Sequence, residues 1–368
     1  MDMIPHMDLS RQMRALDREI TDALHGVVTD CAFSGGAYVE SFEREFAAWL
    51  GGTRFAGVSS GTAALLLALR ALGVGQGDEV ILPANTFIAT AWAPAYLGAT
   101  PVFADCDPFT WELDPASAET KITKRTRAII GVHLYGQAFP LQETMHLAGA
   151  YGLKLVEDCA QAQGTRYGYA RVGTFGDAGC FSFYPGKNLG ACGEAGGVCT
   201  RDPELERRVK MLRNQGAEVR YRHDEVGYNM RMDGFQAAIL SLKLRRLEVW
   251  NQRRKEIYDR YREEIRNPLI VFQGQRPDTE PAWHLAVCCV DHRERFMAHM
   301  TDRGISCGIH YPIPCHLQKA FSELHYQEGD LPNVEYLAAH CVSLPLFPEL
   351  TEQEVGYVVA ACNAYRGC

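Results

Sequence analysis

Between residues 53 and 200, short apolar runs alternate with stretches of helical pattern, and this alternation limits the fold more than any other feature of the 368-residue chain. The runs DEVILP (78–83), TRAIIGVHL (126–134) and LKLVED (153–158) have the length of buried strands. GTAALLLALRALG (61–73) reads as a helix that is apolar on nearly every side. Strands and helices in such alternation form a mostly parallel sheet covered on both faces. We therefore expect an α/β fold.

The pattern changes after residue 200. Charged stretches at 203–214 and 232–266 predict helices, of which the second is long and leads away from the sheet. A smaller α+β portion follows, and its last helix starts near TEQEVGYVV, where Thr351 and Glu354 predict a capping box. We place the boundary at residue 250. Residues 1–250 are predicted to form a large domain that includes the N-terminal segment, and residues 251–368 a small C-terminal domain.

Composition excludes several classes of function. The formal net charge is -8, which does not favour a nucleic-acid binder. No run approaches the roughly 18 apolar residues of a membrane span, and the N-terminal stretch does not resemble a signal peptide. The 13 cysteines are scattered, without a CxxC pair or zinc spacing, so we expect buried thiols and no metal site. These observations predict a cytoplasmic protein.

Chemistry-bearing residues gather where strands are predicted to end, which is where open α/β sheets bind ligands. In SSGTAAL (59–65) a strand runs into a helix through Ser-Gly-Thr, which predicts either an anion site or simply an N-capped helix. In VEDCAQA (156–162), Glu157 and Asp158 end a strand. Such a carboxylate could orient a histidine, bind a metal, pair with a ring nitrogen or cap a helix. Gln161 returns to the same side one turn later.

A lysine and an aromatic residue complete the set. In FSFYPGKNLG (181–190), Lys187 follows Ser182 within a sharply turning loop. Packing against backbone lowers the pKa of an amine and frees it for a Schiff base, whereas the alternative is an incidental surface lysine. Phe87 follows a predicted strand and is either a core residue or a flat platform. A phosphate cradle, a carboxylate, an aromatic face and an amine together match pyridoxal 5′-phosphate.

The sequence resembles the sugar aminotransferases of the DegT/DnrJ/EryC1/StrS family over nearly its whole length. The resemblance is carried by SSGTAAL, GVGQGDEVILPANTFIATA, VEDCAQAQG, FGDAGCFSFYPGKNLGACGEAGGV, GYNMRMDGFQAAIL and HYPIPCHLQ. It implies the fold-type I architecture of aspartate aminotransferase. It also implies an obligate homodimer in which each active site contains residues of both subunits.

Site residues follow from the resemblance position by position. Lys187 is implied as the Schiff-base lysine and proton shuttle, and Asp158 as the partner of the pyridinium nitrogen. Gln161 is implied near the ring hydroxyl and Phe87 on the ring face. The phosphate contacts are implied to be Gly61, Thr62, Ser182 and, across the dimer interface, Asn229.

The resemblance implies transfer of an amino group from L-glutamate to a nucleotide-linked keto-sugar. The stretches GIHYPIPCHLQ and VHLYGQ most resemble members that act on dTDP-linked 3-keto deoxyhexoses. Expected sugar contacts are Tyr184, Tyr311 and His316, with packing between domains as the alternative. Arg213, Tyr221 and Arg231 are expected near the nucleotide phosphates.

Other activities remain as alternatives. They are amination at C4 and the use of a UDP-linked sugar. Some relatives are sugar dehydratases, in which histidine replaces the lysine or cysteines hold an iron–sulfur cluster, and Lys187 and the scattered cysteines argue against both. A non-catalytic regulator would not need the shuttle lysine.

Overall fold

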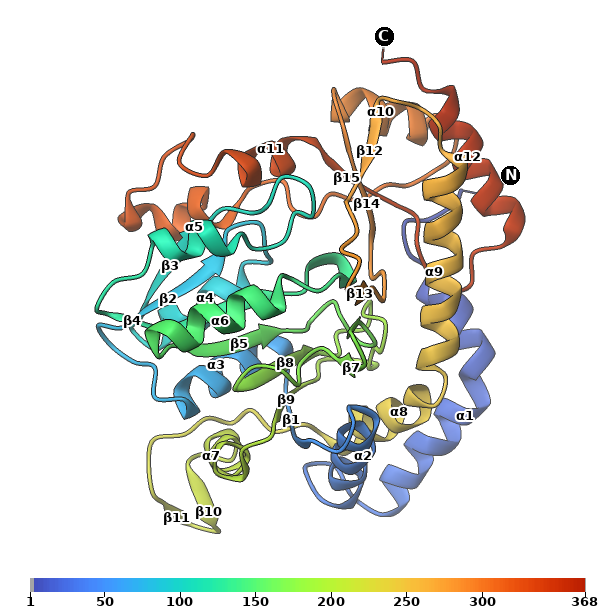
Figure 1. Cartoon of the computed structure of the whole chain (residues 1–368). Helices are drawn as coiled ribbons and strands as arrows, with labels where there is room; N and C mark the ends of the chain where they lie inside the picture. The colour runs from blue at the N-terminus through green and yellow to red at the C-terminus, as the bar shows by residue number, and fades with distance from the viewer. Residues whose placement is uncertain (1–2, 368) are drawn as a thin grey trace.

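The computed structural model describes residues 3–367. In this range seven strands form a central sheet in the order β1-β9-β8-β5-β4-β2-β3. All neighbours from β8 to β3 are parallel, and β9 is antiparallel to both β1 and β8. Helices cover both faces of this sheet (Figure 1). The α/β class and the mostly parallel sheet are confirmed.

The helices are α1 (Leu9–Thr29), α2 (Ala37–Trp49), α3 (Gly61–Ala71), α4 (Ala89–Tyr96), α5 (Pro115–Thr120), α6 (Leu141–Tyr151), α7 (Pro203–Arg213), α8 (Gly234–Leu244), α9 (Leu247–Glu264), α10 (Arg293–Thr301), α11 (Pro332–His340) and α12 (Glu352–Ala364). The strands are β1 (Arg54–Val58), β2 (Glu79–Pro83), β3 (Thr100–Ala104), β4 (Thr126–Val132), β5 (Lys154–Asp158), β6 (Arg166–Tyr167), β7 (Ala170–Arg171), β8 (Ala178–Ser182), β9 (Gly196–Thr200), β10 (Ala217–Val219), β11 (Arg222–His223), β12 (Ile270–Phe272), β13 (Thr279–Glu280), β14 (Ala286–Val290) and β15 (Cys341–Leu344).

Two hydrophobic cores lie on the two faces of the central sheet. Val80 and Leu82 of β2 face the core that contains α3, and Ile81 faces the core that contains α2. This alternation is the period-two pattern of a strand whose two faces are both buried. Nine of the residues of α3 are buried, as its all-round apolar sequence predicts.

The predicted long helix over 232–266 is wrong. The structure divides this stretch into α8 and α9 at Arg245 and Arg246. Leu244 and Leu247, on either side of the break, are both buried in the core that contains α2. Tertiary packing therefore ends α8 where the local sequence, which contains neither glycine nor proline at this point, favours a continuous helix.

A smaller antiparallel sheet, in the order β12-β14-β15, builds the C-terminal part with α10 and α12 around a third core. The predicted capping box at Thr351 and Glu354 is present at the start of α12. Ile4 is buried in this third core, although the sequence assigns the N-terminal segment to the large domain. α9 spans the predicted boundary at residue 250, and the division of the chain into two domains stays a prediction.

Packed phenylalanines hold α2 against the strand that leads into the lysine loop. The Phe46 ring is fully buried, with its centroid 5.1 Å from that of Phe181 and 5.2 Å from that of Phe183. Both contacts have the edge-to-face geometry that aromatic pairs favour. α2 therefore supports the strand end from which the loop starts.

Replacement of Phe46 should test this support. We expect Phe46→Ala to lower the free energy of unfolding by about 3–5 kcal/mol, because it leaves a cavity among the rings. Urea unfolding followed by tryptophan fluorescence measures the loss. Tyr169→Ala is the matched control, since this side chain is fully exposed, and it should change stability by less than about 0.5 kcal/mol. Equal stability of the two variants would contradict the packing described.

Candidate active site

A cavity of about 720 Å³ opens at the carboxyl ends of the central strands, where the smaller C-terminal part meets the large sheet. Its lining brings together most of the residues that the sequence predicts. These are Gly61, Thr62, Phe87, Asp158, Gln161, Ser182, Tyr184, Lys187 and Tyr311.

The loop that carries Lys187 is held by its neighbours. The buried Asn188 side chain donates to the Asn251 carboxamide oxygen on α9 and to the Ala282 carbonyl, both at 2.9 Å. Its own oxygen lies 3.1 Å from Nδ1 of His284. The Lys243 ammonium donates to the Gly190 carbonyl at 2.7 Å. The position of Lys187 is therefore fixed by contacts from several distant segments.

Lys187 is poised to be a free amine. Burial lowers its pKa to about 8, and the charge of Asp158 opposes that shift. No hydrogen bond to its ammonium is found among residues 3–367. Together with its place on the cavity wall, this arrangement favours the reactive amine over the incidental surface lysine.

Asp158 ends β5 next to that lysine. Burial raises the pKa of its carboxyl group, whereas hydrogen bonds from the Ala160 N–H and the Thr90 hydroxyl and the charge of Lys187 oppose the rise. These two donors lie 3.0 Å from Oδ1 and 2.8 Å from Oδ2. The Thr86 hydroxyl lies 2.8 Å from that of Thr90 and continues the chain of contacts. The carboxylate is thus held in one orientation at the cavity wall.

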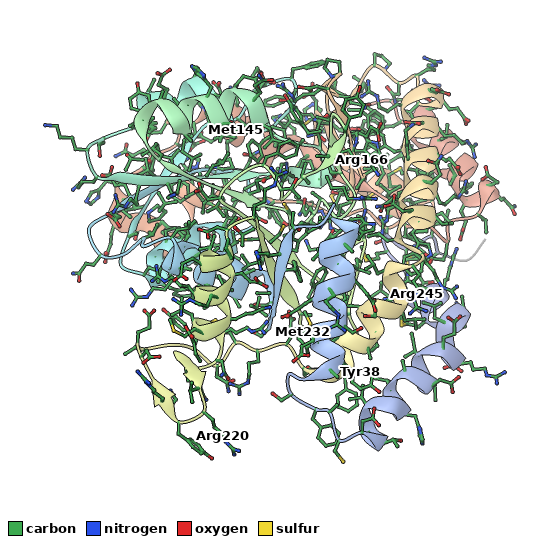
Figure 2. All side chains as sticks on the ribbon, turned by 60° about the horizontal axis from the view of Figure 1, so that its bottom comes forward. Tyr38, Met145, Arg166, Arg220, Met232 and Arg245 are labelled. Carbon is green, nitrogen blue, oxygen red and sulfur yellow. The ribbon has the colours of Figure 1, made fainter. Side chains whose placement is uncertain are left out.

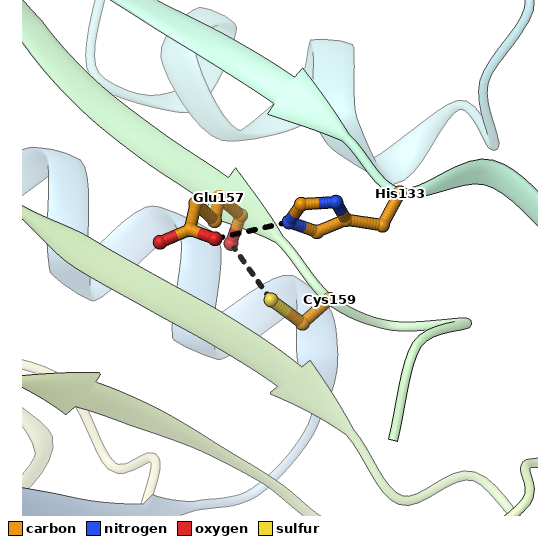
Figure 3. Close-up of side chains that lie close together, drawn as sticks. All are labelled: His133, Glu157 and Cys159. Carbon is orange, nitrogen blue, oxygen red and sulfur yellow. Dashed lines mark hydrogen bonds and ion pairs between the residues drawn. The ribbon is translucent and has the colours of Figure 1, made fainter. Parts of the chain in front are cut away.

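The adjacent Glu157 points to the other side of β5, where it meets His133 and Cys159 (Figure 3). One carboxylate oxygen accepts from the N–H groups of Phe175 and Gly176 at 2.7 and 2.8 Å. The other accepts from the Gly173 N–H at 2.7 Å and lies 3.0 Å from Nε2 of His133. Since each oxygen already has two partners, Glu157 fixes the backbone of residues 173–176 and orients the histidine.

The start of α3 offers an anion cradle. The N–H groups of Ala63 and Ala64 bond to Ser60, which leaves those of Gly61 and Thr62 at the cavity wall for a ligand. A Cβ on Gly61 would lie 2.6 Å from Cβ of Ser182, so glycine is needed for this close approach. The cap and the anion site are therefore compatible functions of the same turn.

Aromatic and amide groups also line the cavity. Phe87 is half exposed, and its ring centroid lies 5.6 Å from that of Tyr311. The Gln161 amide nitrogen donates to the Tyr311 hydroxyl at 3.1 Å, and its oxygen accepts from the Tyr135 N–H at 2.7 Å. Gln161 therefore fixes Tyr311 as well as lining the cavity.

Five predicted contacts do not line this cavity. The His316 ring is buried and lies 3.1 Å from Glu335, so within this chain it packs the 315–317 turn rather than reaching the cavity. Arg213 and Arg231 line a separate cavity of about 460 Å³. Asn229 is exposed, and Tyr221 lies at the tip of the β10–β11 hairpin, which projects from the body next to Arg220 (Figure 2).

The cavity is also lined by residues that no sequence motif predicts. The lining includes Thr90, Glu194 and the histidines His6, His284 and His310. The histidines come from three segments that are far apart in the chain, and no strand-end motif marks them. In HYP (310–312) the sequence singles out only Tyr311 as an expected site residue.

Comparison with known proteins assigns the chain to a family. The model of the DegT/DnrJ/EryC1/StrS aminotransferase family matches residues 14–363. A dTDP-3-amino-3,6-dideoxy-alpha-D-galactopyranose transaminase from Aneurinibacillus thermoaerophilus is 45% identical over 99% of both chains. The erythromycin biosynthesis sensory transduction protein EryC1 from Saccharopolyspora erythraea is 43% identical over 98% of this chain and 99% of its own. The solved structure of S. venezuelae DesV in complex with a ketimine intermediate has a TM-score of 0.97 and 41% identity, covering 99% and 98%.

The chain belongs to this aminotransferase family, and the cofactor of the family is pyridoxal 5′-phosphate. The residues present fit that group. The turn at Gly61 has two N–H groups that could hold a phosphate, and Asp158 has a fixed carboxylate that could pair with a ring nitrogen. The Lys187 side chain lines the same cavity and could supply the amine.

The pKa of Lys187 can be tested by amine modification without cofactor. Burial favours the neutral amine, so reactivity with acetic anhydride should rise through pH 8, whereas ordinary lysines rise near about pH 10.4. Asp158→Asn removes the opposing charge and should move the rise at Lys187 to lower pH. Peptide mass spectrometry reads acetylation at each lysine. A rise at Lys187 that matches the other lysines would contradict its depressed pKa.

No helix that the structure describes is long and apolar enough to cross a membrane.

Proposed function

We propose that the protein transfers the amino group of L-glutamate to C3 of a dTDP-linked 3-keto deoxyhexose. The observation that carries the proposal is the placement of Lys187 beside Asp158 in a cavity of about 720 Å³. The relatives support the choice of carbon, because the Aneurinibacillus protein at 45% identity is named as a dTDP-3-amino sugar transaminase.

Bound pyridoxal 5′-phosphate supplies an aldehyde, an electron-withdrawing ring and a phosphate handle. Around it, Asp158 would keep the ring nitrogen protonated, because a fixed carboxylate favours the charged ring. The N–H groups of Gly61 and Thr62, with Ser182, would hold the phosphate at the start of α3. Phe87 would cover one face of the ring.

Lys187 would move the proton. Its pKa of about 8 leaves a useful fraction of neutral amine near neutral pH, and the resulting ammonium is still acidic enough to return a proton. The loop contacts of Asn188 hold the Lys187 amine at one place. The reacting carbons of glutamate and of the keto-sugar would then be brought to this amine in turn.

Tyr184 and Tyr311 are the proposed sugar contacts. Both line the cavity, and Tyr184 is half exposed at its wall. Their hydroxyl groups can donate to and accept from sugar hydroxyls. Gln161 orients Tyr311 through the 3.1 Å hydrogen bond to its hydroxyl.

The anionic parts of the substrates favour a homodimer with composite sites. No arginine lines the cavity among the described residues, although both glutamate carboxylates and the nucleotide phosphates need positive partners. Asn229, Arg231 and Tyr221 lie outside the cavity of their own chain, and we propose that they complete the cavity of a second copy. Arg213 is held by Glu43 and the Gly57 carbonyl, so its place in nucleotide binding is secondary.

We place the enzyme in the cytoplasm. The twelve cysteines in the described range are all free, and nine of them are buried, which suits a reducing compartment. Cys368 lies outside the described residues.

A substrate panel tests the reaction. With glutamate as donor, dTDP-3-keto-6-deoxyhexose should be converted to the 3-amino sugar, with the nitrogen located by NMR. The dTDP-4-keto and UDP-linked 3-keto sugars serve as the alternatives, and preference for either would replace the proposed substrate.

Lys187→Ala should lose about 10²–10⁴-fold in turnover, because it removes the proton shuttle. Borohydride treatment of the holoenzyme should label Lys187 alone.

Subunit mixing tests the composite site. Lys187→Ala and Asn229→Ala homodimers should both be impaired. After unfolding and refolding together, random pairing gives half heterodimers, each with one intact site, so about a quarter of the wild-type sites should return. A mixture no more active than its components would contradict the sharing of Asn229. Mixing Lys187→Ala with Asp158→Ala, in which each change disables its own subunit's site, leaves no intact site in the heterodimer and is the negative control.

A further inference from the structure

The N-terminal segment forms part of the active-site wall. His6 and Met7 both line the cavity that contains Lys187. A Cβ on Gly186 would lie 3.1 Å from the Met7 sulfur, so the segment packs directly on the lysine loop. Neither residue belongs to a motif that assigns it a role.

This segment is anchored on both sides of His6. On one side, the Ile4 N–H donates to the Gly304 carbonyl at 2.7 Å, and the Ser306 N–H donates to the Ile4 carbonyl at 2.9 Å. On the other side, Arg11 donates to both oxygens of Glu354 at 2.8 and 2.6 Å. These Arg11 bonds are the largest cause that lowers the pKa of Glu354 to about 2. His6 is thus held between two fixed points.

Between these anchors, His6 lies against His310. Their rings are stacked, with centroids 5.5 Å apart and planes 29° apart. Nδ1 of His310 lies 2.8 Å from the Ser343 hydroxyl on β15. The N-terminal segment and β15 therefore both hold the His310 ring, and the contact with Ser343 leaves Nε2 as its other nitrogen.

Gly308 shows how close this packing is. A Cβ at this position would lie 2.9 Å from Cε1 of His310 and 3.2 Å from Nε2 of His6. The Gly308 backbone exchanges hydrogen bonds with Ser343 at 2.9 and 2.8 Å. The two rings, Gly308 and Ser343 therefore form one packed unit at the cavity wall.

We propose that His6 is a positioning residue for the sugar half of the reaction, which stacks on His310 and aims Nε2 of that ring at the keto-sugar. The inference rests on the proposed function for the identity of the substrate. Burial lowers the pKa of His310 to about 4, and the charges of His6 and Lys187 add to this effect. A neutral imidazole suits a sugar hydroxyl, which donates and accepts, better than it suits a glutamate carboxylate.

Separate measurement of the two half-reactions tests the proposal. We expect His6→Ala to raise KM for the keto-sugar about tenfold, because His310 loses one side of its support. The rate with glutamate alone, followed by the cofactor absorbance, should stay within about twofold. His6→Phe keeps an aromatic ring in the stack and should recover most of the keto-sugar KM. Equal losses in both half-reactions, no loss in either, or a Phe variant no better than Ala would overturn the assignment.

A second readout does not depend on the substrate. In ¹⁵N-histidine NMR spectra of the holoenzyme, His6→Ala should shift the ring signals of His310, whereas His6→Phe should shift them less. Unmoved His310 signals in the Ala variant would overturn the positioning role. If no keto-sugar in the panel reacts with the wild type, the proposed function fails, but this NMR comparison still decides the structural half of the inference.

Gly308→Ala is a second variant that tests the same inference if His6→Ala folds poorly. The φ angle of Gly308 is not in the left-handed region, so alanine fits the backbone and the added methyl group pushes on both rings. This variant leaves the anchors at Ile4 and Arg11 intact. It should raise KM for the keto-sugar in the same direction, and a normal KM with displaced rings would overturn the link between ring position and sugar binding.

Discussion

The hydrogen bonds of Asn188 are the contacts on which the active site most depends. They join the loop after β8 to α9 and to the start of the smaller C-terminal part, through Asn251, Ala282 and His284. The neighbouring Lys187 side chain is half-buried and makes no hydrogen bond to any residue that the structure describes, so it contributes no anchor of its own. A buried polar side chain with three partners supplies the rigidity that the reactive residue lacks.

Lys187 and Asp158 are both less easily charged at this site than in water. Burial disfavours the charged forms of both Lys187 and Asp158, and the attraction between them opposes each shift. Two hydrogen bonds, from Ala160 and Thr90, stabilise the charged form of the Asp158 carboxylate. They do not stabilise the charged form of Lys187. These hydrogen bonds and the lysine charge therefore limit the rise in the pKa of Asp158, which lies next to an amine that is easily deprotonated.

The sequence predicts the parts of this site that belong to strand ends. Gly61 follows β1, Asp158 is the last residue of β5 and Ser182 is the last residue of β8. Parallel strands bring such ends to one edge of the sheet. His6 and His310 could not be found in this way, because their contact joins segments 304 residues apart (310 minus 6) and neither has a local pattern that marks it. The break between α8 and α9 is unpredictable for the converse reason, since packing overrides a favourable helical sequence.

The position of the N-terminal segment has a consequence for how the site is assembled. The cavity wall needs residue 6, and residue 6 is held by Gly304 and Ser306 through Ile4 and by α12 through Arg11. The sheet edge that presents Lys187 and Asp158 is formed by strands between residues 54 and 200, but its cover comes from both ends of the chain. Such long-range contacts form against a high loop-closure entropy, so they require an already folded frame. The cofactor side of the site is thus built into the sheet, whereas the side we assign to the sugar depends on the chain ends docking on it.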